Sequence, residues 1–262
     1  LTMSEAEVRA VRGSDVAMVF QDPLSALNPY FTVGDQIAEA YLVHHPDVSK
    51  DAARERALEM LRRVGIPNPE GRIDEFPHQF SGGMRQRIVI AIALVNSPRI
   101  LIADEPTTAL DVTVQAQILD LMASLQQETG MAIILITHDL GVVAEMGREV
   151  LVMYGGRIVE QAPVEGLFEV PTNPYSHGLL DAVRSLDHSG RGSLASIPGT
   201  PPSMLAMPSG CAFHPRCPHA ASVGGRCSSE VPVLREVPGS TSRTACHLPD
   251  ETLVRLGRKV TA

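Results

Sequence analysis

Aromatic residues are scarce in this sequence of 262 residues: they make up 4% of it, and tryptophan does not occur. Aromatic rings that stack on exposed bases are a common means of binding single-stranded nucleic acid. Basic residues are also in the minority, with 22 Lys and Arg against 30 Asp and Glu and a formal net charge of −8. Because a binder of the phosphate backbone normally carries a basic face, nucleic acid is not an expected partner.

Long apolar runs are missing as well. No stretch approaches the ~20 consecutive apolar residues of a membrane-spanning helix, so we expect any role at a membrane to depend on a partner protein. Residues 1–5 have neither the basic start nor the apolar core of a secretory signal peptide. Because the sequence begins with leucine in a charged, helix-like stretch, we expect a fragment whose front is missing.

The most informative stretch that is present is Ile-Leu-Ile-Ala-Asp-Glu-Pro, residues 100–106. Its apolar half predicts a short buried parallel strand, and Asp104 and Glu105 follow where Pro106 ends that strand. Ligands of open α/β sheets bind at the carboxyl ends of strands. An aspartate there can bind Mg²⁺, and a neighbouring carboxylate can orient or deprotonate a water. Taken alone, the same stretch is equally compatible with a strand and an acidic turn.

Two further motifs flank this stretch. Ser81 is a good helix N-cap, and the two glycines after it leave first-turn N–H groups open to an anion. The apolar residues 88–95 predict a helix buried on most sides, and a plain turn before a core helix is the alternative. Residues 131–137 predict another buried strand with His138 at its end. A lone histidine is usually structural, but this one follows the strand next in sequence to the carboxylate strand and can reach the same crevice.

Apolar spacing predicts the elements around these motifs. Residues 33–43 and 49–64 have the spacing of amphipathic helices. Asp111 is expected to cap a helix that ends at Gly130. The remaining expected elements are a short apolar strand at 16–20, two hairpin strands at 150–153 and 157–159 and a helix that ends near residue 186.

In this order, five motifs resemble those of the ATP-binding subunit of ABC transporters: the Q-loop, the signature motif, the Walker B pair, the D-loop and the switch histidine. They are, respectively, Gln21, Ser81-Gly82-Gly83, Asp104-Glu105, Asp111 and His138. The similarity covers residues 15–161. The wording Phe-Ser-Gly-Gly-Met-Arg-Gln-Arg over residues 80–87 is similar to the variant found in dipeptide and oligopeptide importers.

The resemblance implies an α/β fold: a P-loop NTPase core of the ABC ATPase type that lacks its N-terminal part, with a helical subdomain and an irregular C-terminal extension. The expected domains are a core remnant with the Q-loop (1–23), the helical subdomain with the signature motif (24–97), the rest of the core (98–162), and an extension of the oligopeptide-transporter type (163–262).

The resemblance also implies catalytic roles. Glu105 is expected to polarise the attacking water, and His138 to steady the γ-phosphate of ATP. Gln21 is expected to contact the metal or the water and to couple the site to the transporter. Phosphoryl transfer needs mainly such positioning and charge neutralisation.

A second set of residues is implied to bind MgATP at the interface of two subunits paired head to tail. Asp104 is expected to bind Mg²⁺, Asp111 to contact the partner, and Ser81, Gly82 and Gly83 to bind the γ-phosphate across the interface. The phosphate-binding loop Gly-x-x-x-x-Gly-Lys-Ser/Thr, however, occurs nowhere in the sequence. We therefore expect an ATPase whose isolated chain is inactive.

The function implied is ATP hydrolysis that energises the import of dipeptides or oligopeptides. Import of nickel or another small solute is an alternative, because close relatives transport these. A non-catalytic metal-binding remnant is a second alternative. A DNA-repair ATPase with the same motifs is disfavoured, since such proteins insert long coiled coils or zinc modules where only a short segment joins Gln21 to Ser81.

The expected partners are a second ABC ATPase subunit, transmembrane permease subunits and an extracytoplasmic peptide-binding protein, with no nucleic acid. The expected location is the cytoplasmic face of the plasma (inner) membrane, where the permease subunits would hold the chain peripherally.

All the cysteines lie in the last part of the chain, after a stretch rich in Ser, Gly and Pro (188–210) that predicts a loop. They are Cys211, Cys217, Cys227 and Cys246. Disulfides are disfavoured in a cytosolic ATPase, and the Cys-x-x-Cys knuckles typical of zinc are absent. Related importer tails carry a similar set around a [4Fe–4S] cluster, so the resemblance favours a cluster, and zinc or free or disulfide-bonded thiols are alternatives. The substitute ligands would be His214, His219 and His247.

Overall fold

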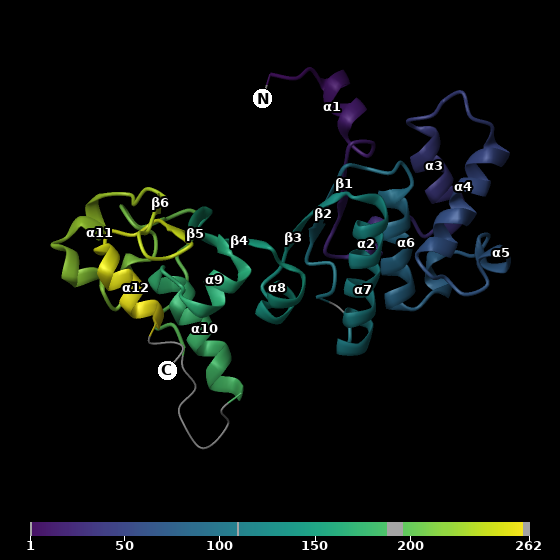
Figure 1. The fold of residues 1–262 in the computed structure, drawn as a ribbon. Coiled ribbons are helices and arrows are strands. Elements are labelled where there is room, and N and C mark those ends of the chain that lie inside the picture. The colour runs from purple at the N-terminus through teal and green to yellow at the C-terminus, as the bar shows by residue number, and fades with distance from the viewer. Residues whose placement is uncertain (1, 109, 188–195, 259–262) are drawn as a thin grey trace. The chain divides into compact units, whose positions relative to one another are not determined.

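The chain divides into two compact units, Leu1–Asp139 and Leu140–Ala262. The computed structural model describes residues 2–108, 110–187 and 196–258 (Figure 1). Among these residues, no helix is both long and apolar enough to cross a membrane.

The first unit is built on a parallel sheet of three strands in the order β1-β2-β3. The strands are β1 (Val16–Val19), β2 (Ile100–Asp104) and β3 (Ala132–Ile136). Ile100 pairs with Val16 on one side and with Ala132 on the other, so the three carboxyl ends lie at one edge of the sheet. The predicted strands are therefore confirmed, and so is their common edge.

Seven α-helices lie in the described part of the first unit, and the predicted helix ends at Ser81, Asp111 and Gly130 are confirmed. They are α1 (Glu5–Val11), α2 (Pro23–Ala26), α3 (Val33–Leu42), α4 (Lys50–Arg63), α5 (Pro69–Arg72), α6 (Gly82–Leu94) and α7 (Val112–Thr129). The Ser81 hydroxyl accepts from the N–H of Met84 at 3.4 Å, and the Asp111 carboxylate accepts from the N–H of Val114 at 3.0 Å. Gly130 ends α7 with a left-handed φ of 70°, which glycine adopts without strain.

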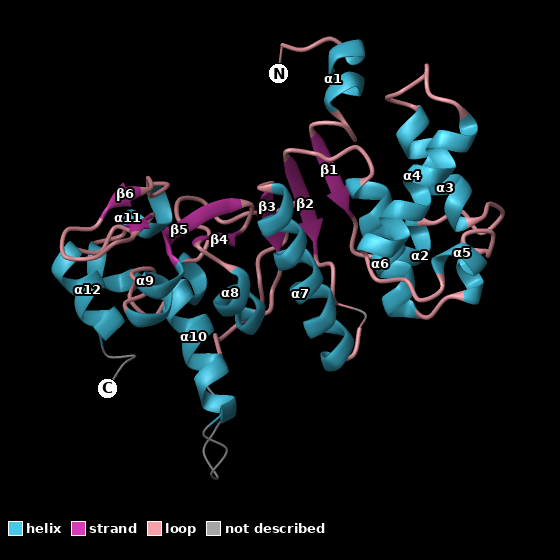
Figure 2. Ribbon diagram, turned by 45° about the vertical axis from the view of Figure 1, so that its right-hand side comes forward, coloured by secondary structure: helices cyan, strands magenta, loops and turns pink. Residues whose placement is uncertain are grey.

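The core of the first unit lies around α6. This helix is buried along most of its length, as its apolar run predicted, and Ile88 and Ile90 are fully buried. It lies between the sheet and the pair α3–α4 (Figure 2). The helix that begins at the Ser-Gly-Gly motif is therefore anchored by packing on several sides.

The second unit contains an antiparallel sheet in the order β4-β5-β7-β6. Its elements are α8 (Leu140–Met146), β4 (Glu149–Tyr154), β5 (Arg157–Pro163), α9 (Val164–Glu169), α10 (Pro174–Asp187), α11 (Arg226–Ser229), β6 (Arg235–Glu236), β7 (Arg243–Thr244) and α12 (Asp250–Arg258). The predicted hairpin is present, and its second strand runs four residues further than predicted, to Pro163.

The C-terminal part is more regular than its Gly, Pro and Ser content indicated. Strand β7 pairs with β5, and Val237, Leu248 and Leu253 form a small buried cluster. Of the predicted loop, residues 188–195 lie outside the described residues, and residues 196–210 contain neither helix nor strand. The few apolar residues near the end of the chain are thus concentrated in one core.

A buried carboxylate joins the hairpin to the segment before α10. Glu160 on β5 is fully buried, and one of its oxygens accepts from the N–H and the hydroxyl of Thr172 at 2.6 and 2.8 Å. Its other oxygen accepts from the N–H of Asn173 at 3.0 Å. The Asn173 amide in turn donates to the carbonyl oxygens of Val159 and Ala245 at 3.0 and 3.3 Å, so one network holds three segments together.

Candidate active site

Glu105 directly follows β2 and has an unusual backbone. Its N–H donates to the Ile136 carbonyl at 2.9 Å, which extends the pairing with β3 by one step. Its φ of 45° lies in the left-handed region, which is uncommon for a residue with a side chain and often marks a functional site. The strand and this turn together fix where the carboxylate points.

Three polar side chains from the other strand ends and the turn meet at the Glu105 carboxylate. The Gln21 amide, just beyond β1, donates to Oε2 at 3.0 Å. His138, just beyond β3, places Nδ1 3.0 Å from Oε1. The Thr108 hydroxyl donates to Oε2 at 2.7 Å. The structure thus brings together the three residues predicted to be catalytic and adds Thr108, which no sequence pattern identified.

These contacts keep Glu105 ionised. The hydrogen bond from Thr108, followed by the one from His138, lowers the pKa of the Glu105 carboxyl below its usual value. Because an ionised carboxylate can only accept, Nδ1 of His138 is the donor in their pair. With 23% of its side chain exposed, Glu105 is also open to a water or a ligand. The site therefore presents an oriented, charged base.

Asp104 ends β2 next to Glu105 and is half-buried. Mg²⁺ in phosphate-transfer sites is usually bound by one or two carboxylates together with substrate phosphates and water. The Asp104 carboxylate at the strand end is therefore a suitable type of ligand for Mg²⁺.

The Ser-Gly-Gly motif and Asp111 form a second group, at the starts of α6 and α7. Ser81 and Gly82 are exposed, as an anion site requires. A Cβ on Gly83 would lie 2.5 Å from Cγ1 of Val114, so only glycine permits this approach of the two helices. Asp111 caps α7, a structural use that leaves its second carboxylate oxygen for other contacts. The packing of Gly83 on Val114 was not predicted.

The four cysteines are free thiols that influence one another electrostatically. Burial, and to a smaller extent the neighbouring thiolates, raises the pKa of Cys217 and that of Cys246 to about 11. The N–H of Cys211 donates to the carbonyl of Cys227 at 2.8 Å. In the parts of the chain that the structure describes, however, no three His, Cys, Asp or Glu side chains form a group able to bind a metal ion. The positions of the four thiols in the structure therefore do not support the predicted iron–sulfur cluster.

The predicted substitute ligands have other contacts. Nδ1 of His214 lies 2.9 Å from the Cys211 carbonyl, and Nε2 of His247 lies 2.9 Å from the Glu230 carbonyl. His219 precedes the single turn 220–223 and lines a small hollow of about 240 Å³ in the second unit.

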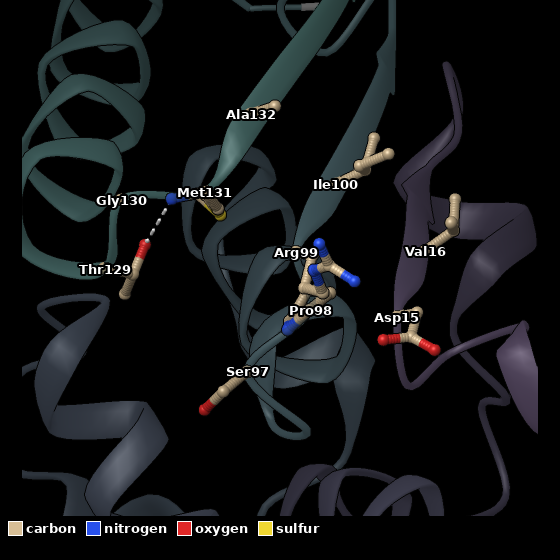
Figure 3. A pocket seen from close by; sticks show the side chains of 10 residues that line it. All are labelled: Asp15, Val16, Ser97, Pro98, Arg99, Ile100, Thr129, Gly130, Met131 and Ala132. Atoms are coloured by element: carbon tan, nitrogen blue, oxygen red, sulfur yellow. Dashed lines mark hydrogen bonds between the residues drawn. The ribbon is translucent and has the colours of Figure 1, made fainter.

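A larger hollow of about 660 Å³ lies at the opposite edge of the three-stranded sheet (Figure 3). It is lined at the starts of β1, β2 and β3 by residues that include Asp15, Arg99 and Thr129. Because the strands are parallel, this hollow is at the far end from Glu105. It takes no part in the candidate site.

Comparison with known proteins agrees with this architecture. Residues 2–108 match the ABC transporter family, and residues 159–223 match the C-terminal region of oligopeptide/dipeptide transporters. The dipeptide transport ATP-binding protein DppD of Bacillus subtilis strain 168 is 52% identical over 245 residues, which cover 94% of this chain and 70% of that protein. DppD of Escherichia coli K12 is 47% identical over 247 residues, 94% of this chain and 74% of that protein.

Among solved structures, the dimeric, ADP- and phosphate-bound ATP-binding cassette MJ0796 superposes with a TM-score of 0.55 at 29% identity. The match covers 62% of this chain and 68% of that one. The fold is thus that of an ABC-type ATPase, whose ligands are ATP and Mg²⁺. The chain belongs to the ATP-binding subunits of ABC transporters, in the dipeptide and oligopeptide branch.

Proposed function

We propose that this chain hydrolyses ATP to drive the import of dipeptides or oligopeptides through a membrane transporter. The convergence of Gln21 and His138 on the Glu105 carboxylate carries the proposal. The peptide substrate is supported by the match of residues 159–223 and by the names of the relatives.

Each residue of the site has a role in this reaction. Glu105 polarises the attacking water and accepts its proton, because its carboxylate is ionised and oriented by three donors. His138 steadies the γ-phosphate, and Gln21 contacts the metal or the attacking water and couples the site to the transporter. Asp104 would bind Mg²⁺, which would supply neutralisation of phosphate charge.

The second group of residues acts on ATP bound by another ABC ATPase subunit. Ser81, Gly82 and Gly83 offer a hydroxyl and helix N–H groups to the γ-phosphate, and Asp111 contacts the partner. The dimeric state of MJ0796 supports such pairing. The other proposed partners are transmembrane permease subunits and an extracytoplasmic peptide-binding protein, and the proposed location is the cytoplasmic face of the membrane. The proposed domains are residues 1–23, 24–97, 98–162 and 163–262.

The test is ATP turnover by this chain alone beside the same chain joined to an ABC phosphate-binding loop segment. The chain alone is expected to bind MgATP weakly and to turn it over at background rate, because its sequence lacks the loop that holds the β- and γ-phosphates. The extended chain, paired with its partner, is expected to hydrolyse ATP. Micromolar affinity with steady turnover in the chain alone would contradict the expectation, and an inactive extended pair would favour a non-catalytic remnant.

We also propose that Cys211, Cys217, Cys227 and Cys246 are the ligands of one structural metal centre, with a [4Fe–4S] cluster as the first choice. Two contacts support it: the N–H of Cys211 donates to the Cys227 carbonyl at 2.8 Å, and Cys211 and Cys217 pack against the same buried cluster. Anaerobically purified protein is expected to be brown and to contain about four irons per chain, and Cys246→Ser is expected to lose the iron. One zinc per chain would favour the runner-up metal, and no stoichiometric metal would refute the centre.

A further inference from the structure

The turn ahead of Ser81 has two backbone hydrogen bonds of its own, from the N–H of Gln79 to the Phe76 carbonyl and from the N–H of Phe80 to the Pro77 carbonyl, and side chains hold it further. Pro77–Gln79 form a single 3₁₀ turn, and the Gln79 side chain accepts from the N–H of Phe76 at 2.7 Å. Phe80, directly before Ser81, is 3% exposed. The direction in which Ser81 and the first turn of α6 point therefore depends on what holds residues 76–80.

Arg72, at the end of α5, is one such side chain. Its Nη2 donates to the Gln79 carbonyl at 3.3 Å, and its guanidinium carbon lies 4.4 Å from the centroid of the Phe80 ring. Its Nη1 lies 3.6 Å from the sulfur of Met84. One guanidinium thus contacts the residue before Ser81 and also Met84, whose N–H the Ser81 hydroxyl caps.

The position of Arg72 is itself fixed. Its Nε donates to the Glu75 carboxylate at 2.8 Å, and 22% of its side chain is exposed. The Glu75 carbonyl accepts from the N–H of Val33 at 3.0 Å, which ties this segment to the start of α3. Arg72 is therefore held at the end of α5 and, through Glu75, against the start of α3.

A second arginine also contacts this turn. Arg85, on α6, donates from Nε to the Pro77 carbonyl at 2.8 Å and from Nη2 to the His78 carbonyl at 3.2 Å. Between them the two guanidinium groups bind three consecutive carbonyls of residues 77–79. The planar guanidinium of Arg72 holds its N–H donors in a fixed fork and lies over the Phe80 ring, which a lysine ammonium does not reproduce.

We propose that Arg72 is a positioning residue for ATP hydrolysis: it fixes the segment before Ser81 so that the Ser-Gly-Gly motif is aimed at the nucleotide of the second subunit. The inference rests on the proposed function, because it assigns the motif to bound ATP. A misplacement of about 1 Å can cost up to ~10²-fold in rate even when the altered residue is remote from the chemistry.

The experiment measures ATP turnover by the complete transporter over a range of ATP concentrations, together with the thermal unfolding midpoint. Arg72→Lys keeps the charge but loses the fork, and it is expected to lower kcat/KM for ATP roughly tenfold. The matched control is Arg62→Lys, because Arg62 forms an exposed pair with Glu70 in the same region. Arg62→Lys is expected to leave kcat/KM for ATP unaltered and to change the thermal unfolding midpoint by a small amount, similar to the change in Arg72→Lys.

Phe80→Leu is a second variant, which keeps an apolar side chain but removes the ring face under Arg72. It is expected to lower kcat/KM about threefold to fivefold. Normal kinetics in Arg72→Lys, or losses in both variants that merely follow the thermal midpoint, would overturn the positioning role. If the unmodified transporter hydrolyses no ATP, the proposed function fails instead.

Discussion

Replacement of Glu105 by glutamine is expected to lower ATP turnover by the complete transporter ~10²-fold or more while ATP binding is retained. The amide keeps the shape of the side chain, and its oxygen can still accept from Gln21 and Thr108, but it cannot accept the proton of the attacking water. Because ATP still binds but is hydrolysed slowly, the paired subunits are expected to accumulate in the closed, ATP-bound state. Phosphate release and the nucleotide content of the purified complex measure the two effects separately.

The matched control is Glu128→Gln on α7. Glu128 pairs with Arg63 at 3.0 Å, and its side chain is 61% exposed, so its replacement is expected to leave turnover unchanged. If Glu105→Gln turns over ATP at a near-normal rate, then Glu105 is not the group that activates water.

Replacement of Glu160 by alanine is expected to lower the free energy of unfolding of the second unit by several kcal/mol. Three donors, on Thr172 and Asn173, lose their acceptor in a fully buried place, and each orphaned donor costs about 1–3 kcal/mol. Urea denaturation followed by circular dichroism measures the change.

The control for this prediction is Glu169→Ala, an exposed position at the end of α9. A surface change of that kind is expected to alter the free energy of unfolding by no more than about 0.5 kcal/mol. A loss below about 1 kcal/mol in Glu160→Ala would show that the network contributes little.

Local patterns predicted the framework of the first unit well. The short apolar runs gave the three strands, and Ser81, Asp111 and Gly130 marked helix ends because capping depends on neighbours in sequence. The meeting of Glu105 with His138 was also predictable, since the carboxyl ends of parallel strands share an edge.

What escaped prediction depends on contacts between distant residues. Thr108 is an ordinary turn residue until the turn folds it back onto Glu105. Strands of two residues, such as β7, have no periodicity to detect, and its pairing with β5 joins positions more than 80 residues apart. The relative positions of the four thiols likewise depend on how loops pack, so neither their number nor their spacing in sequence determines a metal site.

The missing side chain of Gly83 has a consequence for how sequences in this family can change. Because Val114 occupies the space where a Cβ would stand, the residues allowed at these two positions are not independent. A relative with alanine at the position of Gly83 is expected to carry a smaller residue at the position of Val114, and either change made alone is expected to be selected against. The two positions should therefore vary together among homologues, although they lie on different helices.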